Sequence, residues 1–339
     1  MNKSAQGLNR RSVLALGAAA AAFTIVRPAR AATTLRLAVA DPITSSVGKT
    51  ATRFAELVRE STGGAVEIKV FPDGILFGND QNAAVNQLGG GALDGLILAS
   101  SVYASFEPRM NAVSLPYLFS DYDQLKGYLR GAPGQELLGS LDRFNVVGLG
   151  LMLRTFRNTT TRDRAITKVE DFQGLKLRAP NNQLFVRFFQ ALNANPTPMA
   201  FSEVYTALQL GAIDGQENPV EVPFNNRFYE VQKHLNLTRH VADSYLLGLS
   251  RSAWSRIPAN QQDHVRSAAA KVAEEHNTRE IEQENAIIAA LRDKGMTVNE
   301  LGAEEIAKIQ KIAVGLYPDF AGTVGNDFLN KSLSFVGKS

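Results

Sequence analysis

The chain of 339 residues has no cysteine and only four histidines. Without cysteine, disulfides, thiolate metal sites and cysteine nucleophiles are excluded. The four histidines show no metal-ligand spacing such as HExxH, so neither a histidine metal site nor a Ser-His-Asp triad is indicated. The glycine run at 89–91 matches neither GxGxxG nor the P-loop. We therefore expect no metal, no cofactor and no catalytic residue.

Positive charge is concentrated at the N-terminus. The formal net charge is +3, but residues 1–31 hold five basic residues and no acid, so residues 32–339 carry −2. This remainder gives no reason to expect nucleic-acid binding. Hydrophobic residues make up 45% of the chain and charged residues 20%, as in globular proteins, and the length suits two domains.

Residues 1–31 have the order of a secretory signal. Arg10-Arg11 precedes a weakly apolar run of 14 residues from Val13 to Val26, and small residues lead to Ala31. The run is shorter than the ~20 residues that span a bilayer. The arginine pair and the Ala- and Gly-rich run indicate a twin-arginine signal cleaved near Ala31, with an ordinary Sec signal as the alternative. Either signal predicts a periplasmic protein.

Hydrophobic periodicity predicts alternating strands and helices along the chain. The first part contains strands at 34–40, 65–71 and 93–99 and helices at 47–61 and 80–88. This β-α-β-α-β order is typical of a mostly parallel sheet with helices on its faces. Later segments predict strands at 145–153 and 174–179 and helices at 258–294 and 301–316.

Two helix-to-strand junctions resemble each other: QLGGGALDG at 87–95 and QLGAIDG at 209–215. The likeness is either accidental, because glycine ends helices and Asp-Gly forms turns, or the mark of two similar α/β lobes. In the second case the ligand lies in a cleft between the lobes, where strands end. Those ends are Ser100-Ser101 and residues 216–218.

Two arginines are the strongest candidates for ligand binding. Arg157 follows the strand predicted at 145–153, and Arg178 ends the strand at 174–179, just before Pro180. A guanidinium held there can donate two parallel hydrogen bonds to a carboxylate, and a structural salt bridge is the alternative.

Two further residues have both a functional and a structural interpretation. Asn218, in GQENP, can bind a polar ligand or form a turn. Phe201 can close a pocket wall or act as a hydrophobic staple before a helix capped by Ser202.

Three runs, KLRAPNN at 176–182, NPTPMAFSEVYTALQLGAIDGQENP at 195–219 and FYEVQKHLNLT at 228–238, resemble the DctP-type extracytoplasmic solute receptors of TRAP (tripartite ATP-independent periplasmic) transporters. The likeness extends over essentially the whole chain after residue 31. It implies two α/β lobes, each a mixed, mostly parallel sheet with helices on both faces. Crossing strands and a long helix join the lobes, which close on ligand in the cleft between them.

The resemblance also implies a ligand site. Arg178 of the KLR-P motif pairs with a carboxylate, Arg157 assists it, and first-lobe contacts vary among relatives. One departure from the family pattern is FRNTTT, with threonine where many relatives have asparagine. The predicted substrate-binding residues are Arg178, Arg157, Asn218, Phe201, Glu217, Ser100, Asn79 and Asp41.

The predicted boundaries are 32–154 with 244–283 for lobe 1 and 155–243 with 284–339 for lobe 2. The predicted function is that of a monomeric periplasmic solute-binding protein that is not an enzyme. It captures a small carboxylate (a dicarboxylate, sugar acid or 2-oxo acid) by lobe closure and delivers it to TRAP membrane subunits. Two alternatives are a ligand-sensing receptor that feeds a membrane kinase and a periplasmic enzyme acting on an anionic metabolite.

Overall fold

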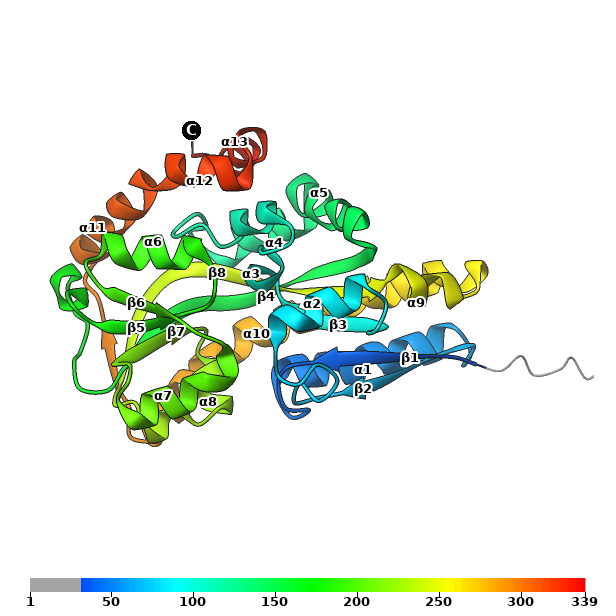
Figure 1. Ribbon diagram of the computed structural model, residues 1–339, viewed down its shortest axis with the longest axis horizontal. Helices are drawn as coiled ribbons and strands as arrows, with labels where there is room; N and C mark the ends of the chain where they lie inside the picture. Colours follow the sequence, from blue (N-terminus) through cyan, green and yellow to red (C-terminus); the bar gives the residue numbers. More distant parts are fainter. Residues whose placement is uncertain (1–31, 339) are drawn as a thin grey trace, which may run out of the picture. The chain divides into compact units, whose positions relative to one another are not determined.

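The computed structural model describes residues 32–338 (Figure 1), so the predicted leader and its cleavage position lie outside the described residues. None of the helices in this described part combines the length and the apolar composition that a membrane span requires.

A single hydrogen-bonded sheet runs through the described residues, in the order β2-β1-β3-β8-β4-β7-β5-β6, with β9 paired to β8. Strands β1, β2 and β3 are parallel and form what we call the first half; β5, β6 and β7 are parallel and form the second half. The antiparallel strands β4 and β8 join the halves. The strand bounds are β1 Thr33–Val39, β2 Val66–Phe71, β3 Gly95–Ala99, β4 Val146–Thr161, β5 Lys176–Ala179, β6 Asn195–Pro198, β7 Gly215–Asn218, β8 His234–Ser250 and β9 Thr297–Glu300.

Helices cover both faces of the sheet (Figure 1). The bounds are α1 Ser46–Ser61, α2 Gln81–Gly89, α3 Ser100–Tyr103, α4 Tyr122–Arg130, α5 Ala132–Ser140, α6 Gln183–Ala191, α7 Val204–Leu210, α8 Glu221–Asn225, α9 Arg251–Arg256, α10 Ala259–Asp293, α11 Ala303–Gly315, α12 Tyr317–Val324 and α13 Asn326–Phe335. Side chains cap several of these helices; Asp80, for example, accepts hydrogen bonds from the first amides of α2.

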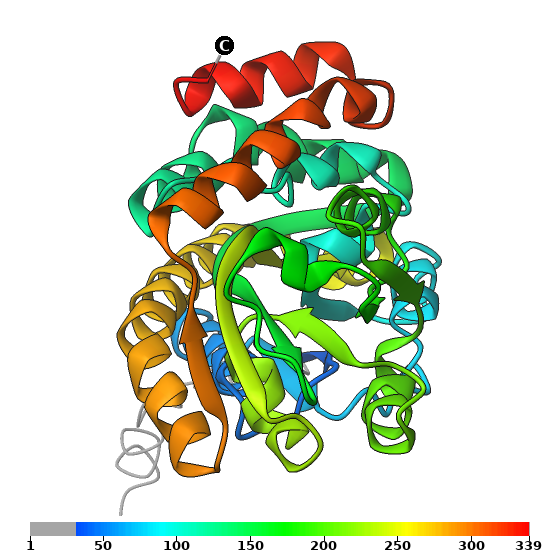
Figure 2. The same cartoon turned by 90° about the vertical axis from the view of Figure 1, so that its left-hand side faces the viewer.

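The long helix α10 serves both halves. Its N-terminal part, around Val265 and Val272, packs with α1 and β1, and its C-terminal part, around Leu291, packs with β8 and Val220. It also lies along β4 and β9 (Figure 2). The predicted architecture of two α/β parts joined by crossing strands and a long helix is therefore confirmed.

The two similar helix-to-strand junctions occupy matching places in the two halves. Oδ2 of Asp94 accepts a hydrogen bond from the amide of Arg36 on β1, and Oδ2 of Asp214 accepts one from the amide of Lys176 on β5, both at 2.8 Å. Each aspartate precedes the glycine that begins β3 or β7. The short repeat thus marks the same structural arrangement in both halves. In each, the aspartate carboxylate holds the neighbouring parallel strand through a hydrogen bond to its backbone.

The crossing strands differ from the sequence prediction. β4 continues eight residues beyond the predicted end at 153, to Thr161, and for β8 the sequence predicted only a crossing strand near residue 244, without bounds. The expectation that Arg157 follows a strand end is therefore wrong, because Arg157 lies inside β4. The polar sequence at Asn158 and Thr159 concealed the continuation, because polar residues are usually exposed, whereas here the strand is paired on both sides and these side chains are buried.

The main apolar core is continuous across both halves. It includes Leu96 of β3, Leu125 of α4 and Phe185 of α6. The C-terminal helices α12 and α13 pack against the 3-10 helix Pro108–Ala112, and α13 also packs against α5, both within the segment predicted for lobe 1 (Figure 1). The predicted lobe boundaries stay a prediction.

The contact between β4 and β7 generates the first testable prediction. A Cβ at Gly215 would overlap the carbonyl oxygen of Thr160 and lie 3.1 Å from Cγ2 of Thr161. We expect Gly215→Ala to lower the free energy of unfolding by about 1–3 kcal/mol, because both neighbours belong to a buried strand that cannot move freely. Urea denaturation measures the change.

The matched control is Gly322→Ala. Gly322 is exposed within α12, and a Cβ added there would meet open space. This change is expected to stabilise the protein by about 0.5–1 kcal/mol. Equal effects of the two substitutions would contradict the crowding at Gly215.

Candidate ligand-binding site

Two arginines of β4 point into one cavity because the strand is bulged. The pairing of β4 with β8 shifts register between Arg154 and Arg157 and again between Arg157 and Thr159. In a regular strand, residues three apart face opposite sides. Here Nη1 of Arg154 and Nη1 of Arg157 both donate to Oδ2 of Asp243, at 3.1 and 3.3 Å. The bulges therefore redirect the side chains, as bulges near binding sites often do.

Asp243 of β8 is fully buried and is held by the first half and by both crossing strands. The hydroxyls of Ser100 and Ser101, at the start of α3, each donate to its carboxylate at 3.1 Å. The backbone amide of Ser244 adds a third hydrogen bond at 2.8 Å. Ser100 was predicted to contact ligand, but it is fully buried and its hydroxyl is directed to Asp243.

Glu217 of β7 holds Arg157 from the other side. Oε2 and Oε1 of Glu217 accept from Nε and Nη2 of Arg157, both at 2.6 Å, and Nε2 of His240 lies 3.1 Å from Oε2. Burial alone would raise the pKa of Glu217, but the charge and hydrogen bonds of Arg157 lower it to about 2. Glu217 was predicted to contact the ligand. Its carboxylate instead pairs with Arg157, and the residue does not line the small cavity described below.

Arg154 is likewise neutralised. Its Nη2 donates to Oε1 of Glu221 at 3.2 Å, and its guanidinium carbon lies 4.5 Å from the ring centre of Tyr245. Together with Asp243, these contacts pair Arg154 and Arg157 with two protein carboxylates each.

Arg178 differs from both of them. The residue belongs to β5 and is 4% exposed, yet no carboxylate of the described residues forms an ion pair with it. Nε and Nη2 donate to the carbonyl oxygen of Met199, at 3.3 and 2.9 Å, which leaves the Nη1–Nη2 edge available. Phe201 lies beside the guanidinium, 5.9 Å from ring centre to carbon. Burial lowers the pKa of Arg178 to about 10, so it remains charged at neutral pH.

These side chains meet at a cavity of about 50 Å³ between the halves. A second cavity of about 40 Å³ shares Arg178 and Phe201 with it and reaches Asn79. The structure thus brings together six of the eight predicted residues and leaves out Ser100 and Glu217; the six are Asp41, Asn79, Arg157, Arg178, Phe201 and Asn218.

The first half contributes two of these residues from loops. Asp41 follows β1 and is partly buried, and Asn79 adopts a left-handed conformation (φ 62°) in the turn before α2. Burial raises the pKa of Asp41 to about 6, although the charge of Arg154 opposes the shift. Asp41 makes no side-chain hydrogen bond or ion pair with the described residues, so its carboxylate is open to a ligand.

The sequence interpretation missed Arg154, Asp243, Glu221 and Tyr245. One signal was available, because Asp243 is an isolated acid in the largely apolar run HVADSYLLGLS. An acid inside such a run must find partners when the run is buried. Nothing in the sequence identified which arginines those partners are.

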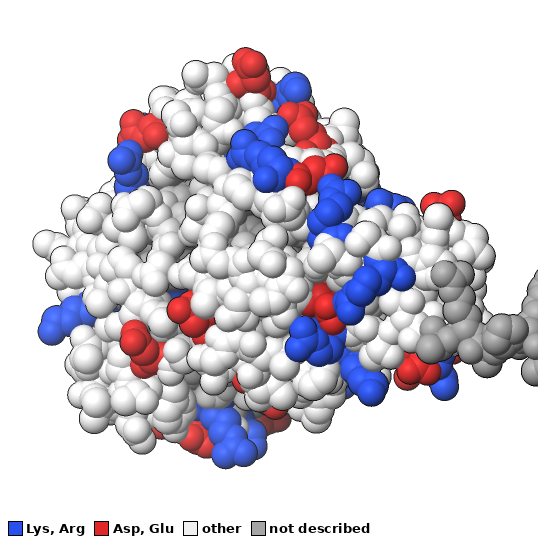
Figure 3. Space-filling view, turned by 45° about the vertical axis from the view of Figure 1, so that its right-hand side comes forward, with Lys and Arg blue, Asp and Glu red and all other residues white. Residues whose placement is uncertain are grey.

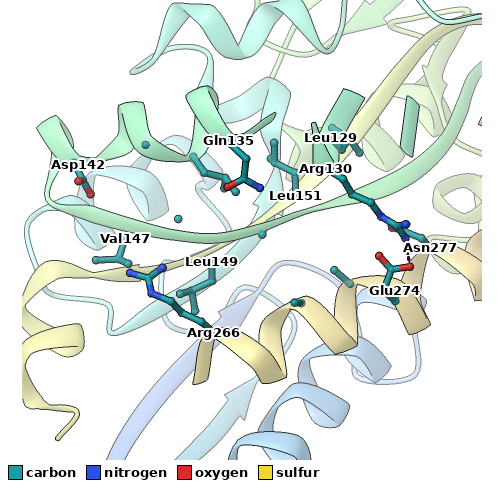
Figure 4. Close-up of a pocket in the computed structure, with 16 residues that line it drawn as sticks. Leu129, Arg130, Gln135, Asp142, Val147, Leu149, Leu151, Arg266, Glu274 and Asn277 are labelled. Atoms are coloured by element: carbon teal, nitrogen blue, oxygen red, sulfur yellow. Dashed lines mark ion pairs between the residues drawn. The ribbon is translucent and has the colours of Figure 1, made fainter. Parts of the chain in front are cut away.

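A larger cavity lies elsewhere and has different chemistry. This groove of about 460 Å³ runs between α5, β4 and α10, with the ion pair of Arg130 and Glu274 at its rim (Figure 4). None of the three buried arginines lines it. The candidate site is therefore distinguished by its converging buried charges and not by its volume.

Surface charges of both signs are mixed on one face of the described residues. On the face shown in Figure 3, basic and acidic side chains are interspersed and large areas carry neither. Within residues 32–338, no group of three or more His, Asp or Glu side chains is placed to hold a metal ion.

Comparisons with known proteins agree with this geometry. The model of bacterial extracellular solute-binding protein family 7 (DctP) matches residues 38–323. The chain is 32% identical to the sialic acid-binding periplasmic protein SiaP of Vibrio cholerae, over 94% of this chain and 96% of that protein. These similarities confirm the resemblance that the motifs indicated.

Two solved structures are similar over nearly their whole length. A sugar acid binding protein from Advenella mimigardefordensis, in complex with galactonate, superposes with a TM-score of 0.86 at 27% identity, covering 90% of this chain and 98% of that one. A TRAP periplasmic solute binding protein from Sulfurospirillum deleyianum, with bound succinate, gives 0.84 at 29% identity, with coverages of 90% and 99%.

The pair of Glu217 and Arg157 leads to the second prediction. Glu217→Gln removes the charge that neutralises a buried guanidinium, and we expect the free energy of unfolding to fall by about 3–5 kcal/mol at pH 7. The control is Asp163→Asn, which breaks the exposed ion pair between Asp163 (69% exposed side chain) and Lys233 (70%). It should lower the free energy of unfolding by less than about 1 kcal/mol.

The pH dependence of stability provides a second test of the ion pair between Glu217 and Arg157. The pKa of Glu217 is lower in the folded chain than its ordinary 4.5, so its contribution to stability is present above pH 4.5 and is lost as the pH falls towards 2. The difference in unfolding free energy between wild type and Glu217→Gln should shrink over that interval. A constant difference would contradict the ion pair.

Proposed function

The chain belongs to bacterial extracellular solute-binding protein family 7, and from this premise we propose that it captures a small organic acid and delivers it to the membrane subunits of a TRAP transporter. The family and the relatives named above are binding proteins. We propose the same role here, without a catalytic step.

The observation that best supports this proposal is the buried, unpaired guanidinium of Arg178 among the described residues. A guanidinium that is 4% exposed and lacks a carboxylate partner among the described residues has lost most of its hydration without gaining a direct ion pair. A ligand carboxylate on the Nη1–Nη2 edge supplies that charge through two parallel hydrogen bonds. The other two buried arginines cannot replace it, because protein carboxylates already occupy them.

The remaining cavity residues complete the proposed site. Arg157, held by Glu217 and Asp243, contributes its charge from a fixed position. Asn218 lines the cavity with its amide bonded to Oε1 of Gln216 at 2.7 Å, which orients its carbonyl oxygen. Phe201 covers one side of the ligand.

We further propose a periplasmic location. Relatives are named as periplasmic proteins, and residues 1–31 have the composition of a twin-arginine signal cleaved near Ala31.

Ligand entry requires motion. Because Arg178 is nearly inaccessible and the cavities hold only a few water-sized spaces, an organic acid enters only when the halves separate. We propose that rotation occurs where the β4–β8 ladder is interrupted, near residues 154 and 244.

The third prediction concerns Arg178→Lys. Lysine keeps the charge but lacks the planar pair of donors, so we expect binding of the cognate acid to weaken by about 2–4 kcal/mol, or roughly 30- to 1000-fold. Calorimetric titration measures the affinity. Without ligand, the melting temperature should change little, since Arg178 has no ion-pair partner to lose among the described residues.

Arg187→Lys is the matched control. Arg187 is exposed on α6 and does not line the two small cavities, so its replacement should leave affinity unchanged. If Arg178→Lys binds as well as wild type, the carboxylate does not lie on this guanidinium. If it instead lowers the melting temperature of the empty protein by several degrees, Arg178 has a structural role.

The fourth prediction concerns closure. Small-angle scattering with and without saturating ligand should give a smaller radius of gyration in the bound state, because the halves rotate towards each other. An unchanged radius would contradict the clamp.

A further inference from the structure

Asp41 and Arg178 are two ionic side chains without a charged partner among the described residues, and both line one cavity. Asp41 comes from the loop after β1 in the first half, and Arg178 from β5 in the second. We propose that Asp41 determines specificity, so that the ligand is a hydroxylated monocarboxylate, such as a sugar acid, and not a dicarboxylate. This inference rests on the proposed function.

The first argument is charge balance. Three acids, Glu217, Glu221 and Asp243, are paired with only two arginines, Arg154 and Arg157, so this cluster already has one formal negative charge in excess. A single ligand carboxylate neutralises Arg178 and leaves Asp41 as the open acid. The second carboxylate of a dicarboxylate would enter a small cavity that already holds the negative charge of Asp41, and like charges that face each other at a closed site cost several kcal/mol.

The second argument is hydrogen bonding. An ionised carboxylate only accepts hydrogen bonds, so Asp41 needs a donor from the ligand. A hydroxyl group supplies one. Burial raises the pKa of Asp41 to about 6, which still leaves it mostly ionised at neutral pH.

The third argument excludes an ammonium group as the donor. Arg154, Arg157 and Arg178 line the same cavity as Asp41. Although Arg154 is paired with Glu221, its charge acts on Asp41 more strongly than the charge of Glu221 does, so a cationic ligand group beside Asp41 is repelled by Arg154, whereas a neutral hydroxyl is not. Gln81 and Asn79, in the adjoining walls, offer further amide groups that suit a ligand with several hydroxyls.

The experiment compares acids of equal chain length that carry, besides one carboxylate, several hydroxyls, a second carboxylate, an ammonium group or no further polar group. Calorimetry at about pH 8, where Asp41 is ionised, measures the affinity of the full secreted chain for erythronate, succinate, 4-aminobutanoate and butanoate. A six-carbon set of gluconate, adipate, 6-aminohexanoate and hexanoate covers a longer ligand. In the better-binding set we expect the hydroxy acid to bind at least ~10-fold more tightly than the other three.

Two variants connect this preference to Asp41. Asp41→Asn removes the charge at nearly constant shape, and the preference for hydroxy acid over dicarboxylate should fall below about 3-fold. Asp73→Asn is the matched control, because Asp73 adds to the negative field at Asp41 but does not line the cavity. Asp73 has a φ of 58°, which asparagine adopts readily, and its replacement should leave the preference within about 2-fold of wild type.

The outcomes separate this inference from the function on which it rests. If the dicarboxylate or the amino acid of a set binds as tightly as the hydroxy acid, or if Asp41→Asn leaves the preference unchanged, Asp41 does not select the ligand. The proposed function survives that result as long as Arg178→Lys weakens binding. If no acid of either set binds below about 10 mM, the proposed function and this inference both fail.

Discussion

Asp243 carries a fully buried charge, and a buried carboxylate is stable only where cations and hydrogen-bond donors surround it. Its donors come from the start of α3, from β8 itself and from two arginines of β4. The side chain of Asp243 therefore fixes the position of α3, which belongs to the first half, relative to the crossing strands β4 and β8. Because Asp243, Glu217 and Glu221 neutralise Arg154 and Arg157, the cavity keeps one cation, Arg178, for a ligand.

The same strand irregularities serve both binding and motion. The bulges of β4 turn Arg154 and Arg157 to one side, and they also interrupt the ladder with β8 where the chain passes from one half to the other. An interrupted ladder bends more easily than a regular one. In the proposed closure, the residues that hold the ligand thus lie beside the segment that bends, so ligand contacts and lobe rotation are mechanically connected.

The two halves share one helix-to-strand junction, but the strand that follows it has a different role in each half. Asp94 and Asp214 fix the neighbouring parallel strand in the same way, and β3 and β7 then end at the cleft. In the first half that end leads to serines that stabilise Asp243; in the second it carries Glu217 and Asn218. The first half adds Asp41, the second adds Arg178, and the ligand is proposed to bridge these opposite charges.

Local patterns in the sequence were sufficient for the α/β class, the first three strands, the long helix and Arg178 with its strand end, because periodicity and turn residues act over a few neighbouring positions. The motifs at 176–182 and 195–219 also indicated the family. Only the tertiary structure decided the rest: that β4 and β8 join the halves into one sheet, that Arg154 and Arg157 face the same side, and that Ser100 and Glu217 support other residues. These features depend on register and on ion pairs and hydrogen bonds between distant residues, such as the hydrogen bond of Ser244 to Ser100, 144 positions away, which no local pattern encodes.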